Sequence, residues 1–119
     1  MVKHKATNME DKTTRLMYIE RKTGYGDNGP ARIGRVTFSN SGRTVYYKGS
    51  AYQSCKGQGI SGNYFDVETG EEYWISGPKK SGHDRHWAGG GAVEIDEDVI
   101  DEYWRDVRGC QPPKNPHIA

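Results

Sequence analysis

The sequence predicts a mainly β fold: an antiparallel sheet or small open β-barrel of about six short strands, followed by one C-terminal helix. Three observations predict it. Residues 64–75 have the pattern of a strand, a tight turn and a second strand, and they form the segment richest in aromatic residues. Sixteen glycines are spread along the chain, which favours many turns between short strands. Residues 97–108 have the apolar spacing of an amphipathic helix.

The remaining predicted strands are short segments with alternating apolar residues or with glycine-rich turns at their ends. In chain order the predicted strands are 15–22, 31–39, 43–48, 51–55, the two arms of 64–75, and 92–95. The turn 40–42 joins two of them into a second hairpin. A long polar loop, 77–91, follows the aromatic hairpin, and loops of this length are often functional.

The aromatic hairpin is expected to turn at Glu68-Thr69-Gly70, with Gly70 in the left-handed region as a bulge. This turn would place Val67 opposite Glu71, and Tyr64 opposite Trp74. One face then carries the expected core residues, and the other carries aromatic residues expected to meet Tyr103 or Trp104 of the helix. The expected core residues of the hairpin are Phe65, Val67, Tyr73 and Ile75.

The first two strands have less regular patterns. In 15–22, Leu16 and Tyr18 share one side while Met17 and Ile19 share the other, so the facing of this strand stays open. In 31–39, Ile33 is out of step with the later apolar residues. We expect a bulge at the neighbouring glycine, residue 34, to restore a single facing.

The helix is predicted over 97–108, with Asp96 as its N-cap and Gly109 as its end. Acidic residues in the first turn and arginines in the last suit the helix dipole. The stripe expected to cover the sheet consists of Val99, Ile100, Tyr103, Trp104 and Val107.

The length of 119 residues predicts one domain, residues 15–109, between a disordered leader, 1–14, and an extended Pro-rich tail, 110–119. The basic N-terminus lacks the apolar run of a secretory signal, and no segment reaches transmembrane length. We therefore expect a cytoplasmic protein without membrane contact, in which Cys55 and Cys110 are reduced thiols.

The net charge of +1 hides an uneven distribution. Residues 1–60 carry a balance of +7 and residues 61–119 a balance of −6. Either the surface is strongly dipolar, or the two halves pair with each other in the fold.

Several motifs are weak evidence for chemistry. The Gly-x-Gly-x-x-Gly spacing occurs at 24–29 and 57–62, but a strand rather than a helix follows each, so we interpret both as loops. His83 and His86 lie in a glycine-rich loop without a second paired metal motif, so we expect no metal and no cofactor. An acid/base site that joins these histidines or Asp84 to the hairpin carboxylates is the enzymatic alternative, a small hydrolase.

The strongest candidate site combines cations with aromatic rings, the pattern with which small barrels hold single-stranded nucleic acid. One group lies in the loop after the aromatic hairpin and the other on or near the second hairpin. The alternative is that these side chains only solvate exposed strands. The candidate binding residues are Lys79, Lys80, Arg85, Trp87, Arg32, Arg35, Arg43, Tyr46 and Lys48.

The chain also resembles a family of short uncharacterised bacterial proteins over most of residues 16–109. The shared motifs are 17–20, 29–39, 64–77, 84–85, 94–99 and 102–104. Some members of that family carry the name 1-deoxy-D-xylulose-5-phosphate synthase, a thiamine-diphosphate enzyme. Such enzymes need large paired α/β domains, several times what this chain can build. The resemblance therefore implies no activity, and no functional residue is transferred from it.

Taken together, these patterns favour a small non-enzymatic binding module for nucleic acid or for another protein. The hydrolase described above is one alternative. The other is a structural subunit that buries its second aromatic hairpin face against a partner or a second copy.

Overall fold

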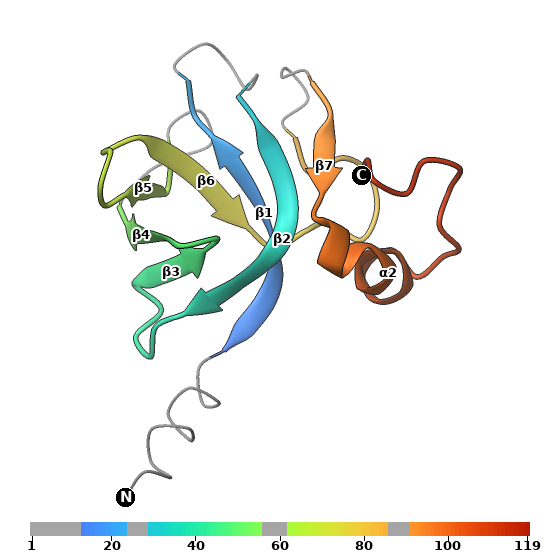
Figure 1. Ribbon diagram of the computed structural model, residues 1–119, viewed down its shortest axis with the longest axis horizontal. Coiled ribbons are helices and arrows are strands. Elements are labelled where there is room, and N and C mark those ends of the chain that lie inside the picture. Colours follow the sequence, from blue (N-terminus) through green and yellow to red (C-terminus); the bar gives the residue numbers. More distant parts are fainter. Residues whose placement is uncertain (1–12, 24–28, 56–61, 86–90) are drawn as a thin grey trace, which may run out of the picture.

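The computed structural model describes residues 13–23, 29–55, 62–85 and 91–119. Within them lie seven strands and one short C-terminal helical stretch (Figure 1). The strands are β1 (Thr14–Arg21), β2 (Ala31–Phe38), β3 (Thr44–Tyr47), β4 (Ser50–Ser54), β5 (Tyr64–Asp66), β6 (Glu72–Ser76) and β7 (Val93–Ile95). The helical stretch runs through the 3₁₀ turn η1 (Glu97–Val99), α2 (Ile100–Glu102) and the π-helical η2 (Tyr103–Val107).

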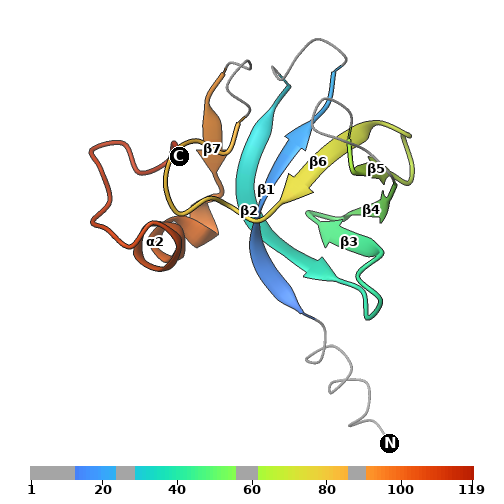
Figure 2. The same ribbon diagram turned by 180° about the vertical axis from the view of Figure 1, so that it is seen from behind.

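Six of the strands form a closed antiparallel barrel in the order β1-β6-β5-β4-β3-β2. The ring closes because β1 pairs with β2 from Thr14 opposite Thr37 to Glu20 opposite Ala31. The predicted mainly β fold with a C-terminal helix is confirmed, and the barrel is closed rather than open. Closure pairs the edges that an open sheet would expose. The extra strand, β7, runs parallel to β2, and β7 and the helix lie beside the barrel, away from β3 to β5 (Figures 1 and 2).

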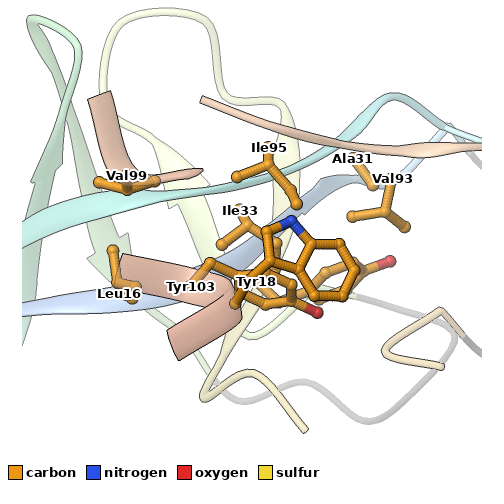
Figure 3. Close-up of a cluster of buried hydrophobic side chains, with 9 residues drawn as sticks. Leu16, Tyr18, Ala31, Ile33, Val93, Ile95, Val99 and Tyr103 are labelled. Atoms are coloured by element: carbon orange, nitrogen blue, oxygen red, sulfur yellow. The ribbon is translucent and has the colours of Figure 1, made fainter. Parts of the chain in front are cut away.

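Two separate clusters form the core, one on each face of β1 and β2. The barrel interior holds Met17, Ile19, Val36, Val45, Tyr47, Tyr52 and Ile75. The outer cluster, between the sheet and its cover, holds Leu16, Tyr18, Ala31, Ile33, Val93, Ile95, Val99, Tyr103 and Trp104. Figure 3 shows side chains from β1, β2, β7 and the helix meeting in this outer cluster. Both sides of β1 are thus buried, which explains its continuous apolar run.

The predicted bulge at Gly34 is wrong. The β1–β2 register runs without interruption through Met17 opposite Gly34, so Ile33 faces the outer cluster and Val36 faces the barrel interior. Gly34 serves another purpose, because a Cβ there would lie 2.3 Å from Oδ2 of Asp96 and 2.5 Å from the Tyr47 ring. Glycine at this position allows both groups to approach the strand.

The register of the aromatic hairpin differs by one residue from the prediction. Oδ1 of Asp66 accepts the backbone N–H groups of Glu68 and Thr69 at 2.8 and 3.2 Å, and the Asp66 N–H donates to the carbonyl of Glu71 at 2.8 Å. These bonds close a turn that is one residue longer than predicted. Gly70 nevertheless adopts the predicted left-handed conformation, with a φ of 77°. A shift of one residue exchanges the two faces of a strand.

The shift changes which hairpin residues are buried. Tyr64 lies opposite Tyr73 and packs against the barrel interior, so its predicted contact with the helix is wrong. Phe65 is only half-buried and Val67 is 52% exposed, so neither is a core residue as predicted. As predicted, Ile75 is buried in the barrel interior and Tyr73 packs against it, and Trp74 packs against the outer cluster, which contains Tyr103 and Trp104.

The helix packs as its stripe predicts. Val99, Tyr103 and Trp104 are buried in the outer cluster, and Ile100 and Val107 pack against it. The tail turns back toward this cover: the Trp104 Nε1–H donates to the Pro116 carbonyl at 2.8 Å. Further along, Ile118 forms a bridge with Glu94, and the Ala119 N–H donates to the Val93 carbonyl at 2.9 Å. The C-terminal residues therefore cover the outer edge of β7.

Of the predicted leader, residues 1–12 lie outside the described residues. Thr14 already begins β1, and the Phe38 N–H donates to the Thr13 carbonyl at 2.8 Å. No helix in the described part of the chain is long and apolar enough to cross a membrane.

The two oppositely charged halves of the sequence pair with each other. Cations of the first half meet carboxylates of the second in the pairs Arg21–Glu71, Arg32–Glu94, Arg32–Asp96, Arg35–Glu102 and Lys48–Asp96. The pairing interpretation therefore holds for these groups. These ion pairs neutralise part of the cationic surface that the sequence alone indicates.

Candidate functional site

The inward-facing residues of the barrel leave a cavity of about 240 Å³ at one mouth. Residues at alternate positions point to the same face of a strand, so β1 contributes Ile19 and Arg21 while Glu20 points outward. The lining combines three tyrosines with two arginines and two apolar residues: Ile19, Arg21, Pro30, Arg32, Tyr47, Tyr52 and Tyr73. Aromatic walls with a few convergent polar groups are typical of ligand pockets, and barrel mouths are a common place for them.

The tyrosines supply flat walls and neutral hydroxyl groups. Tyr52 and Tyr73 meet edge to face, with ring centroids 4.7 Å apart. Burial raises the pKa of Tyr52 to about 12. The pKa of Tyr47 is also raised, first by burial and then by its hydrogen bond to Asp96. At neutral pH each hydroxyl is therefore protonated, and a hydroxyl group can both donate and accept a hydrogen bond.

The two arginines at the mouth are held with very different strength. The Arg32 Nε–H donates to Oδ1 of Asp96 at 2.6 Å, and Asp96 is only 3% exposed. Arg21 Nε lies 3.3 Å from Oε2 of Glu71, and both of these side chains are more than 40% exposed. An exposed pair of this kind contributes about 0–1 kcal/mol, whereas a short hydrogen bond between charged groups contributes about 1.5–3 kcal/mol. Arg32 is thus fixed in place, and Arg21 can exchange its partner for a ligand.

Asp96 joins the mouth to the helix, in a way that the sequence does not predict. It occupies the predicted N-cap position, and its carbonyl accepts the Val99 N–H at 3.0 Å, but its carboxylate makes no cap hydrogen bond. The carboxylate points toward the barrel instead, where it accepts the Tyr47 hydroxyl at 2.5 Å and lies 3.4 Å from Lys48 Nζ. The prediction that the Asp96 side chain caps the helix is therefore wrong. The arginine, lysine and tyrosine on the barrel bind a buried carboxylate more strongly than the backbone N–H groups of the helix do.

The structure separates the sequence-predicted binding residues into several groups. Arg32 lines the mouth and Lys48 lies beside it, whereas Arg35 pairs with Glu102 of the helix. Arg43 and Tyr46 are exposed on the β3 hairpin, on the side of the barrel away from the helix (Figure 1).

The remaining candidates belong to the loop after β6. Lys79 and Lys80 are exposed, and the carbonyl of Lys79 accepts a hydrogen bond from Arg108 of the helix end at 3.4 Å. Arg85 is 8% exposed and points inward, where its guanidinium donates to the carbonyls of Gly29 at 2.8 Å and Gly91 at 3.2 Å. Trp87 lies outside the described residues. Lys80 lines a pocket with Glu102, the partner of Arg35, but Arg85 points inward, so the described candidates do not all share one surface.

Sequence reasoning missed Arg21, Tyr52 and Tyr73 as site residues. The alternation of β1 could have indicated Arg21, because Arg21 follows Met17 and Ile19 at every second position and so lies on the same face of the strand. Which parity faces the barrel interior is decided only by the pairing of distant strands.

The structure places the residues of the hydrolase alternative differently from the prediction. His83 is exposed, and His86 lies outside the described residues. Asp84 does line a pocket, together with Glu20 of β1 rather than with the hairpin carboxylates. Among the described residues, no three His, Cys, Asp or Glu side chains are placed to hold a metal ion.

The burial of Asp84 predicts how the stability of the fold depends on pH. Burial raises the pKa of Asp84 above its ordinary value of about 3.9. The folded state therefore holds this proton more tightly than the unfolded chain. The resulting stability is fully present below about pH 3.9 and is lost as the pH rises through the raised pKa. Relative to the wild type, we expect Asp84→Asn to gain stability as the pH rises across this window, in urea unfolding measured at several pH values.

Asp106→Asn is the matched control for this prediction. Its hydrogen bond with Arg105 lowers the pKa of Asp106, so the sign reverses, and the variant should lose relative stability as the pH rises. Equal pH dependence of the two variants would contradict the assignment for Asp84.

Fold and cavity together define a small closed β-barrel with a tyrosine- and arginine-lined mouth. No family model, curated protein or solved structure matches this chain.

Proposed function

We propose that this protein is a non-enzymatic binding module that holds single-stranded nucleic acid at the barrel mouth. One base would enter the tyrosine-lined cavity, and the adjoining phosphate would meet Arg21. The observation that carries the proposal is the convergence of Tyr52, Tyr73 and Arg21 on one cavity of about 240 Å³. Such a role fits the cytoplasmic location that the sequence predicts.

The cavity supports a single flat group rather than a complete larger ligand. Its volume is below the range of about 300–1,000 Å³ that is usual for drug-sized ligands. Every nucleobase has a flat face, and stacking on an aromatic side chain contributes about 1–3 kcal/mol per base. The neutral tyrosine hydroxyls offer donors and acceptors to the edge of an unpaired base.

The charges around the mouth support an anion next to that base. A guanidinium group binds phosphate through two parallel N–H donors, and the exposed pair with Glu71 costs little to exchange. Because most cations of the fold are paired, we expect few phosphate contacts and a weak salt dependence. Arg43, Lys79 and Lys80 are exposed and make no ion pair within the described residues, so they add longer-range attraction.

The test is fluorescence anisotropy with labelled single-stranded RNA and DNA of about eight nucleotides, within the usual site size. Arg21→Ala should weaken binding about tenfold, the equivalent of one charged hydrogen bond. It should also reduce the salt slope by roughly one contact. Tyr52→Phe, which keeps the ring, should weaken binding less.

The matched control is Arg105→Ala, which removes the same charge from an exposed position on the helix. It should leave the affinity nearly unchanged. If neither oligonucleotide binds at low salt, or if Arg21→Ala and Arg105→Ala behave alike, the proposal is wrong. A larger loss from Arg43→Ala or Lys79→Ala than from Arg21→Ala would move the site to the surfaces that the sequence indicated.

A further inference from the structure

A second pocket, of about 350 Å³, lies on the outer face of β1 and β6. Trp74 of β6 pairs with Glu20 of β1, so both side chains stand on the same face of the sheet. The segment after β6 passes over this face and adds Lys79 and Asp84 to the lining. The pocket shares no residue with the barrel mouth, because Ile19 and Arg21 point to the other face of β1.

A buried carboxylate forms one wall of this pocket. Glu20 is 2% exposed, and its two oxygens accept the Tyr18 hydroxyl at 2.6 Å and Lys22 Nζ at 3.2 Å. The guanidinium of Arg85 lies 3.6 Å away. Carboxylate oxygens offer about four acceptor positions, so Glu20 is held rigidly and can still accept a ligand hydroxyl.

The opposite wall also carries a carboxyl group in a fixed position. Oδ1 of Asp84 accepts the backbone N–H of Lys79 at 2.6 Å. Burial raises the pKa of this group above its ordinary value. Trp74 is half-buried, packs against the outer cluster and also lines the pocket.

We propose that this pocket binds a neutral polyhydroxylated ligand, a saccharide, with its apolar ring face on Trp74 and its hydroxyl groups on Glu20 and Asp84. The lining contains two carboxylates and two lysines, so its negative and positive charges balance. The lining therefore favours neither a cationic nor an anionic ligand. Hydroxyl groups suit this mixture because each can donate to a carboxylate and accept from an ammonium group. The volume lies at the lower end of the range for ligand pockets, which suits a short saccharide.

The test is a titration of the ¹⁵N-labelled full chain with glucose, galactose and N-acetylglucosamine, followed by NMR chemical shifts. Glucuronate and glucosamine serve as charged relatives of the same size. We expect at least one neutral sugar to bind with a Kd on the order of 1 mM. The shifts should appear at the Trp74 indole and at the amides of Gly77 and Lys79, and the amides of Tyr52 and Tyr73 should not move.

Two variants sharpen the result. Trp74→Phe keeps an aromatic ring in the outer cluster and should weaken sugar binding about tenfold. Arg21→Ala, at the barrel mouth, should leave it unchanged. The inference is overturned if no neutral sugar shifts these signals, if a charged relative binds more tightly than its neutral counterpart, or if the shifts map to the mouth. Because the wild-type titration needs no variant, a folding defect in Trp74→Phe cannot obscure the answer.

Discussion

Asp96→Ala should destabilise the fold by about 3 kcal/mol, because it removes a charged acceptor from Arg32 and leaves the buried Tyr47 hydroxyl without this partner. Asp96 is 3% exposed and receives hydrogen bonds from Arg32 and Tyr47, with Lys48 Nζ nearby. Urea unfolding followed by fluorescence measures the effect as a lower midpoint with an unchanged slope. Relative to a total stability of about 5–15 kcal/mol, the expected loss is large.

The control for this change is Asp98→Ala, two residues further along on an exposed position. We expect its effect to stay within about 0.5 kcal/mol. Asp96→Asn should have an intermediate effect, since it keeps an acceptor oxygen but removes the charge that Arg32 faces. If Asp96→Ala were as mild as Asp98→Ala, the carboxylate would not be the link between barrel and helix that the geometry indicates.

Tyr103→Ala should cost about 3–5 kcal/mol by opening a cavity in the outer cluster. Tyr103 is 1% exposed, and its ring meets that of Trp104 at a centroid distance of 5.0 Å. It lies between the helix and the outer faces of β1 and β2, so the change tests whether the helix is an integral part of the fold. Urea unfolding gives the stability, and far-UV circular dichroism reports whether the helix remains.

Tyr46→Ala removes the same side chain from a position that is 42% exposed, and we expect it to cost about 1 kcal/mol or less. A loss in Tyr103→Ala no larger than in Tyr46→Ala would mean that the barrel is stable without its cover. A two-step unfolding curve for the wild type would lead to the same conclusion, because barrel and cover would then unfold separately.

The register of the 64–75 hairpin shows where local sequence reasoning fails. Both the three-residue turn that the sequence suggests and the longer one that forms place Gly70 in the left-handed region. The difference arises from the side chain of Asp66, whose carboxylate accepts two backbone N–H groups and lengthens the turn by one residue. Because strand faces alternate, this local choice decides that Tyr64 rather than Phe65 packs inside the barrel.

The sequence by itself determined the mainly β fold, the approximate strands and the amphipathic helix with its stripe. These features arise from periodicity and turn residues that act over a few neighbouring positions. Only the tertiary structure decided that the barrel closes, that Gly34 makes room for Asp96, and that Arg21 joins two tyrosines at one mouth. Each of these depends on contacts between residues far apart in the chain, whereas local patterns predict only the pairing of strands joined by a short turn.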